Sequence, residues 1–139
     1  MNELNKYKKK GYFNFKPTDR ISQVCNAPGE GFNYGGIYII HSIKEGQKSE
    51  LVYIGISGRI DKKTGSLIAR QDGIKGRIVR GKRDGEPRKN YWIRMMRSQG
   101  IDKLKISWYV VHDNDQFRDT PSQIERRLIK KYQPAWNRI

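Results

Sequence analysis

The sequence lacks several features that define common classes of protein. Among its 139 residues there is one cysteine, Cys25, which excludes an internal disulfide and a cysteine-rich zinc site. The apolar runs are only strand-length, so no segment is expected to span a bilayer. The lysines of the N-terminal MNELNKYKKK are not followed by an apolar stretch, so they do not form a signal peptide. We therefore expect a cytoplasmic protein with no membrane partner.

Acidic residues are also scarce. The chain has 14 Asp and Glu against 29 Lys and Arg, which gives a formal net charge of +15. Such a one-sided charge favours a polyanionic partner, most commonly nucleic acid. Residues 59–97 hold much of the excess, with thirteen basic and four acidic residues. The predicted DNA-binding residues are Arg59, Arg70, Lys75, Arg80, Lys82 and Arg83.

The pattern of the chain changes near residue 35. Residues 1–34 are basic and aromatic without a clear period, and NAPGEGFNYGG is rich in turn residues, which predicts an N-terminal arm. Residues 35–139 are patterned and are expected to form one domain. Four aromatic residues of the arm are consistent either with stacking on bases or with packing against the domain: Tyr7, Tyr12, Phe13 and Phe15.

Within the domain, three strands and three helices are expected. Strand-like residues 36–43 and 51–56 flank the polar loop KEGQKSE and predict an antiparallel hairpin, and residues 104–111 predict a third strand. Helices are expected over 74–83, over KNYWIRMMRSQ before Gly100, and from Thr120, where T-x-x-Q indicates a capping box. The predicted fold is α+β, a small three-stranded antiparallel sheet with flanking helices against one face.

The hairpin carries two tyrosines among branched apolar residues. If Tyr38 lies opposite Tyr53, both hydroxyls share one face of the sheet, and Gly55 leaves room on that face for a group to approach the backbone. A cross-strand aromatic pair that merely stabilises the hairpin is the structural alternative. The other face would then hold the core residues Ile37, Ile39, Val52 and Ile54.

The last helix places a carboxylate on its apolar side. At 100° per residue, Glu125 projects between Leu128 and Ile129, while the basic residues of IERRLIKKY lie opposite. A carboxylate facing a core is costly unless it is paired or binds a metal. A buried ion pair with an arginine and a divalent-cation site are the two alternatives.

Taken together, these segments resemble the GIY-YIG nuclease family. GIY stands at 36–38 and YIG at 53–55, IKGRIVRGK offers Arg77 after the hairpin, and IERRLIKKYQPAWN supplies Glu125 and Asn137. The resemblance covers residues 35–139, with four motifs in the family's order. Its extended stretch between YIG and the arginine resembles the restriction-enzyme branch.

The resemblance implies a role for each motif residue. Tyr38 would be the general base on water, Tyr53 would position water or phosphate, and Arg77 would clamp the phosphate. Glu125 would bind Mg²⁺, with Mn²⁺ as a substitute, and Asn137 would order the site. Gly36 and Gly55 of the two tripeptides would let the backbone be approached closely. Tyr38 would need nearby cations to lower its pKa from about 10.

The match departs from the family at two places. The position four residues after Arg77, commonly His or Tyr, is Gly81, and YIG is followed by Ile56 and Ser57 rather than a Lys or His. Arg80 is an alternative to Arg77 as the clamp. The residue that relays the proton of Tyr38 is left open among Lys75, Arg80, Lys82 and His41.

The sequence therefore predicts a metal-dependent DNA endonuclease, stand-alone or restriction-like, with a DNA partner. There is no P-loop, so no nucleotide cofactor is expected. The oligomeric state is not predicted. The alternative is a basic nucleic-acid-binding module on the same scaffold that does not cleave, and the missing relay residue favours it.

Overall fold

The fold is built on one four-stranded antiparallel sheet. A computed structural model describes residues 1–137. The strand order is β1-β8-β2-β3, with all neighbours antiparallel. The strands are β1 (Lys10–Phe15), β2 (Gly35–Ile43), β3 (Glu50–Ser57) and β8 (Lys103–His112). The α+β class, the hairpin and the third strand are confirmed, but the expected number of three strands was wrong because β1 adds a fourth.

Strand β1 arises from the segment expected to be an arm. Its residues Lys10 to Phe15 pair in register with Tyr109 to Leu104 of β8. Phe13 and Phe15 alternate into the core, whereas Tyr12 points the other way and is 57% exposed. Tyr7 is also buried, ahead of the strand. Three of the four aromatic residues considered for base stacking therefore pack within the molecule.

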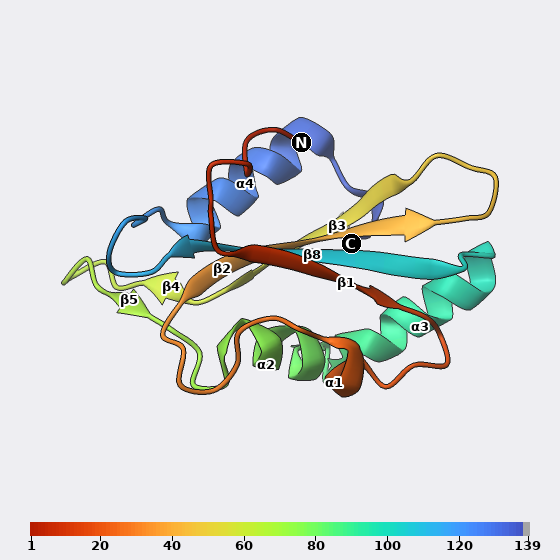
Figure 1. The fold of residues 1–139 in the computed structure, drawn as a ribbon, viewed down its shortest axis with the longest axis horizontal. Helices are drawn as coiled ribbons and strands as arrows, with labels where there is room; N and C mark the ends of the chain where they lie inside the picture. Colours follow the sequence, from red (N-terminus) through yellow and green to blue (C-terminus); the bar gives the residue numbers. More distant parts are fainter. Residues whose placement is uncertain (138–139) are drawn as a thin grey trace.

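Four helices and two small ribbons complete the described chain (Figure 1). The helices are α1 (Ile21–Val24), α2 (Gly73–Arg80), α3 (Arg88–Gln99) and α4 (Pro121–Tyr132), followed by the 3-10 turn η1 (Ala135–Asn137). The ribbons are β4 (Arg59–Ile60) with β5 (Leu67–Ile68), and β6 (Lys82–Arg83) with β7 (Glu86–Pro87). Within residues 1–137, every helix is too short or too polar to cross a membrane.

The helices cover both faces of the sheet, so the expectation of a single covered face was wrong. Helices α1, α2 and α3 lie below the sheet in Figure 1, and α4 lies above it with the N-terminal segment. Strand β2 explains this arrangement, because GGIYII is buried at every position and both of its faces need apolar cover. Tyr38 and Ile40 face one core cluster with Trp92, and Ile37 and Ile39 face the other with Ile124.

Local signals account for some of the helix ends. Gly100 adopts φ 65° directly after α3, the left-handed conformation that glycine accepts readily. Helix α4 begins at Pro121 as expected, although the Thr120 side chain makes no capping hydrogen bond. Helix α2 ends at Arg80, three residues earlier than predicted. The chain there turns into the β6–β7 hairpin, whose tip residues Asp84 and Gly85 both have positive φ.

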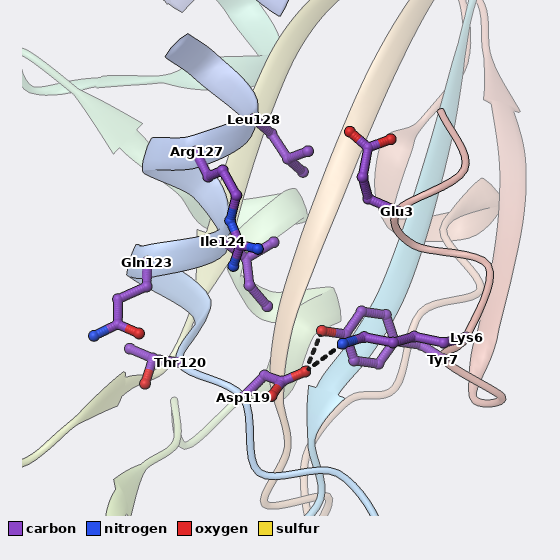
Figure 2. Close-up of a pocket in the computed structure, with 9 residues that line it drawn as sticks. All are labelled: Glu3, Lys6, Tyr7, Asp119, Thr120, Gln123, Ile124, Arg127 and Leu128. Atoms are coloured by element: carbon purple, nitrogen blue, oxygen red, sulfur yellow. Dashed lines mark hydrogen bonds and ion pairs between the residues drawn. The ribbon is translucent and has the colours of Figure 1, made fainter. Parts of the chain in front are cut away.

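A set of paired polar side chains, here called the N-terminal clasp, holds residues 3–9 against the C-terminal third of the chain. Figure 2 shows the Tyr7 hydroxyl and the Lys6 ammonium meeting Asp119, at 2.5 and 3.3 Å, beside a pocket lined by α4. The remaining contacts join Glu3 to Lys131 and Tyr132, and Lys9 to Asp113. Every acid in the clasp has a partner.

Candidate active site

The hairpin register differs from the expected one. Tyr38 lies opposite Gly55, and Tyr53 lies opposite Ile40, so the two tyrosines are diagonal neighbours with ring centroids 5.9 Å apart. The pairing shifts after Ile40 and leaves Val52 as the extra residue of a β-bulge. The bulge turns Val52 into the cluster that holds the tyrosines, so its expected place beside Ile37, Ile39 and Ile54 was wrong.

The two motif glycines are approached by side chains of the protein itself. A Cβ at Gly55 would lie 2.3 Å from the ring of Tyr38, and a Cβ at Gly36 would lie 2.4 Å from the Ile74 side chain of α2. Any larger residue at position 55 would displace the Tyr38 ring. Gly55 therefore determines where the first tyrosine sits, and Gly36 how closely α2 approaches β2.

Arg88, which the sequence analysis did not single out, joins the two tyrosines. It is the first residue of α3, and its guanidinium donates hydrogen bonds to the hydroxyls of Tyr53 and, at 3.5 Å, of Tyr38. The guanidinium carbon also lies 5.5 Å from the centroid of the Tyr53 ring. Trp92, one turn along α3, packs edge-on against Tyr38 with the centroids 6.4 Å apart.

The β6–β7 hairpin explains how Arg88 reaches this position. The backbone N–H of Arg88 donates to the carbonyl of Gly81 at 2.8 Å, which closes the base of the hairpin. A Cβ at Gly81 would lie 2.4 Å from the carbonyl oxygen of Arg77, so the position favours glycine. Gly81 thus starts a hairpin. No pattern in the sequence distinguishes Arg88 from the other basic residues of 59–97.

Tyr38 is enclosed by this packing. It has 0% exposed surface, and burial raises the pKa of its hydroxyl, while the nearby charges of Arg88 and Arg77 act in the opposite direction. The lowering of the Tyr38 pKa that a general-base role would need is not found in this arrangement, because the loss of hydration outweighs both arginines. Two cations, Arg88 and Arg77, nevertheless lie near enough to act on the Tyr38 hydroxyl.

Glu125 lies between the core-facing residues Ile124 and Leu128 of α4 and is itself half-buried. Burial raises the pKa of its carboxyl, against the opposing effects of Arg88, Arg77 and Arg126. Within residues 1–137 it makes no hydrogen bond and no ion pair within 4 Å. The ion-pair alternative for this carboxylate is thus not formed among the described residues.

The arginines around α2 fall into two groups. Arg70 and Arg80 both form ion pairs with Asp72, at 3.1 and 2.8 Å. Arg77 has no ion pair or side-chain hydrogen bond among the described residues, and its charge is felt by both Tyr38 and Glu125. It lines a hollow of about 340 Å³ with Arg59 and Arg70. Arg77 is therefore better placed than Arg80 to receive a phosphate.

The other basic residues singled out from the sequence lie in different surroundings. Lys82 is exposed, Lys75 packs near Gly29 of the loop before β2, and Arg83 lies 5.8 Å from the ring centroid of Tyr91. His41 is on the opposite face of the sheet from Tyr38, beside Lys105. Among the residues considered as a proton relay, none is brought to Tyr38, and Arg88 is there instead.

Asn137 connects the end of the described chain to the hairpin. Its side chain accepts from the backbone N–H of Ile54 at 2.8 Å and donates to the carbonyl of the same residue at 2.9 Å. These two bonds imitate a further strand along the open edge of β3. The residue next to Tyr53 is thereby held in place, which agrees with an ordering role for Asn137.

A divalent cation suits this site only if other ligands arrive with it. No group of three or more His, Cys, Asp or Glu residues that could hold a metal occurs within residues 1–137. Glu125 is nevertheless a half-buried carboxylate without a partner there. Mg²⁺ commonly binds one or two carboxylates and completes its shell with waters and substrate phosphates. The donor set therefore fits a Mg²⁺ ion that a phosphate helps to hold.

Comparisons of the chain with protein-family models, with curated proteins and with solved structures find no match in any of the three.

Proposed function

We propose that the protein is a metal-dependent DNA endonuclease of the GIY-YIG kind, which hydrolyses phosphodiester bonds. One observation carries the proposal: two tyrosines, two arginines and one carboxylate without an ion-pair partner converge from β2, β3, α2, α3 and α4. We call these residues the tyrosine–arginine cluster: Tyr38, Tyr53, Arg77, Arg88 and Glu125.

The arginines would bind the scissile phosphate. Arg77 has no ion pair among the described residues that a phosphate would have to displace. It lines the hollow with two further arginines, Arg59 and Arg70. Paired guanidinium groups stabilise the negative charge that develops on a phosphodiester during hydrolysis. Glu125 would hold Mg²⁺ or Mn²⁺, and that ion would supply charge neutralisation at the phosphate and leaving oxygen.

Tyr38 would accept the proton of the attacking water as a phenolate, and this requires its hydroxyl to become accessible and to lose its own proton to solvent first. Arg88 covers both hydroxyls, so transfer of its hydrogen bonds to an incoming phosphate would uncover them. The same guanidinium would then stand beside the phenolate and stabilise it. In this proposal Arg88 supplies positive charge beside the phenolate and does not relay its proton, because a guanidinium has no site to accept one; the phenolic proton passes to solvent water.

A nucleic-acid-binding module that does not cleave is the second candidate function. The observation that favours it is the complete burial of Tyr38 together with the raised pKa of its hydroxyl. In that case the tyrosines would only support α3, and the net charge of +15 would account for binding.

The deciding experiment is cleavage of supercoiled plasmid by the purified protein with Mg²⁺ or Mn²⁺. We expect nicked or linear DNA that is lost with EDTA and in Glu125→Ala. Glu45→Ala, which alters an exposed glutamate in the loop between β2 and β3, is the matched control and should cleave normally. Discrete bands would indicate a sequence-specific, restriction-like enzyme.

The contrary outcome is binding of DNA without cleavage. If plasmid and branched DNA are both retarded on a gel in a salt-dependent way but stay intact with either metal, the nuclease proposal fails. The binding module then becomes the better account. Cleavage that persists in Glu125→Ala would indicate a contaminating nuclease or another metal ligand, and would contradict the role given to Glu125.

A further inference from the structure

One part of the sheet surface is not covered by a helix. It lies at β1 and β8, away from the tyrosine–arginine cluster. On the face that α4 covers, the apolar cluster is centred on β2 and β3, at Ile37, Ile39 and Ile54. By register, Lys10 and Tyr12 of β1 lie on this same face, next to Tyr109 and Ser107 of β8. At this place the surface has a shallow hollow of about 400 Å³. We call it the basic–aromatic face, lined by Lys10, Gly11, Tyr12, Lys105, Ser107 and Tyr109.

Tyr12 is the most exposed large hydrophobic residue of this face. It is 57% exposed on a regular strand whose neighbouring aromatic residue, Phe13, is buried. The ammonium of Lys105 lies over its ring, 4.6 Å from the centroid. The packing of β1 depends on Phe13 and Phe15, so an aromatic residue at position 12 is not needed to form the core.

The charges of the basic–aromatic face have one sign. Strands β1 and β8 together contain Lys10, Lys103 and Lys105 but no acidic residue. Beside Lys105 across the sheet, the pKa of His41 is lowered by burial and then by the charges of Lys105 and the N-terminal amine. Positive groups therefore gather here without carboxylates to balance them on these two strands.

We propose that the basic–aromatic face binds single-stranded nucleic acid, with a base stacked on Tyr12 and the flanking phosphates on Lys10 and Lys105. Exposed aromatic rings between lysines on an open sheet are how proteins bind single strands without reading their sequence. The face lies on the opposite side of the sheet from Tyr38. Strand binding here is additional to the proposed cleavage and does not depend on it.

The test is the affinity for a fluorescent oligothymidylate of about 15 nucleotides, followed by anisotropy. All proteins would carry Glu125→Ala and be kept in EDTA, so that cleavage cannot distort the result. We expect Tyr12→Leu to weaken binding about tenfold, because the loss of one base-stacking contact has an effect of this order. Tyr12→Phe should bind as the parent does, since it keeps the ring.

Matched controls separate stacking from general effects of substitution. Phe32→Leu changes a residue that is 51% exposed in the loop before β2, and it should leave binding unchanged. Lys105→Ser and Lys10→Ser should each reduce the salt dependence by about one unit of slope, whereas Lys48→Ser, in the exposed β2–β3 loop, should not. Thermal melting of each variant confirms that it is folded.

Two results would overturn the proposal. One is equal affinity of Tyr12→Leu and its parent for the oligothymidylate. The other is an equal loss, in Tyr12→Leu, of binding to heparin, to anionic vesicles or to an acidic polypeptide, because none of these offers bases to stack. The latter result would assign the face to a general polyanion or to another class of partner. Neither outcome affects the plasmid test of the tyrosine–arginine cluster.

Discussion

The N-terminal clasp and the tyrosine–arginine cluster differ in whether their charged side chains form ion pairs. In the clasp, the acids Glu3, Asp113 and Asp119 each lie within about 3.3 Å of a lysine. In the cluster, Glu125 and Arg77 feel one another's charge, yet neither forms an ion pair among the described residues. Paired charges fix the chain in place. Charges held near each other without pairing keep their capacity to bind something else, at a cost in stability.

The strongest test of this difference between the clasp and the cluster is to remove the carboxylate of Glu125. Glu125→Gln should reduce plasmid cleavage by about a hundredfold or more, as expected when a group that stabilises the transition state is lost. The same change should leave the urea midpoint unchanged or higher, because an unpaired, half-buried charge disappears. A clear drop in the midpoint would show that Glu125 is a structural residue like those of the clasp.

The comparison can next be tested by deleting one hydroxyl from each region. Tyr38→Phe should lower cleavage by about a hundredfold if Tyr38 is the general base, with little change in stability. Tyr7→Phe should cleave normally but lose about 1 kcal/mol of unfolding free energy, since Asp119 loses a hydrogen bond. Urea unfolding and plasmid cleavage, measured on both variants, should give opposite patterns. Identical patterns would contradict the distinction.

Two arginines three residues apart on α2 provide a finer test. Arg77→Ala should reduce cleavage by about a hundredfold, while Arg80→Ala should reduce it only a few-fold, because Arg80 is already engaged with Asp72. Initial cleavage rates at fixed salt would measure both. Equal losses would mean that Arg80 serves as the clamp, the alternative that the sequence leaves open.

The smallest effect expected is on the pH dependence of stability. Hydrogen bonds from its own backbone, Lys131 and Tyr132 lower the pKa of Glu3 from 4.5 to about 2. Against the effect of burial, Lys9 and the backbone N–H groups of Phe117 and Asp115 lower the pKa of Asp113 from 3.8 to about 2. A lowered folded-state pKa gives stability that is complete above the unfolded value and is lost as pH falls toward 2.

Glu125 should act with the opposite sign. Burial raises the pKa of its carboxyl, so its protonated form favours the folded state at acid pH, and this contribution is lost as pH rises through the raised value. Urea unfolding between pH 2 and 7 should therefore show a shallower acid loss in Glu3→Gln and a steeper one in Glu125→Gln. The same slope in both variants would contradict the comparison.

The sequence predicts local features of this protein better than its long-range ones. Gly100 and Pro121 mark helix boundaries because their backbone preferences act within one turn, and the strand spans follow from apolar runs. Glu125 could be singled out because a carboxylate on an apolar stripe is anomalous in any fold. The pairing of β1 with β8 could not be predicted, since it joins residues about ninety positions apart and KGYFNF alternates only weakly.

The site was only partly accessible to sequence reasoning for similar reasons. The register error at Val52 follows from a bulge, which no pattern of period two reveals. Arg88 is one of thirteen basic residues in residues 59–97, and only the geometry of the β6–β7 hairpin distinguishes it. Cover on both faces is consistent with GGIYII, where every residue is apolar or small, but the alternating pattern of a hairpin predicts one solvent-facing side and so conceals it.

The strand order carries a consequence for how the chain acquires this fold during synthesis. β8 lies between β1 and β2 in the sheet. Neither β1 nor β2 can therefore pair with β8 until residues 103–112 have been synthesised. Among the pairings of the four-stranded sheet, only β2–β3 can form early, because its strands are neighbours in sequence. Such non-local pairing slows folding and leaves apolar strand edges exposed on the nascent chain. The lysines around β1 would help to keep the unpaired β1 segment from pairing with a second copy of the chain.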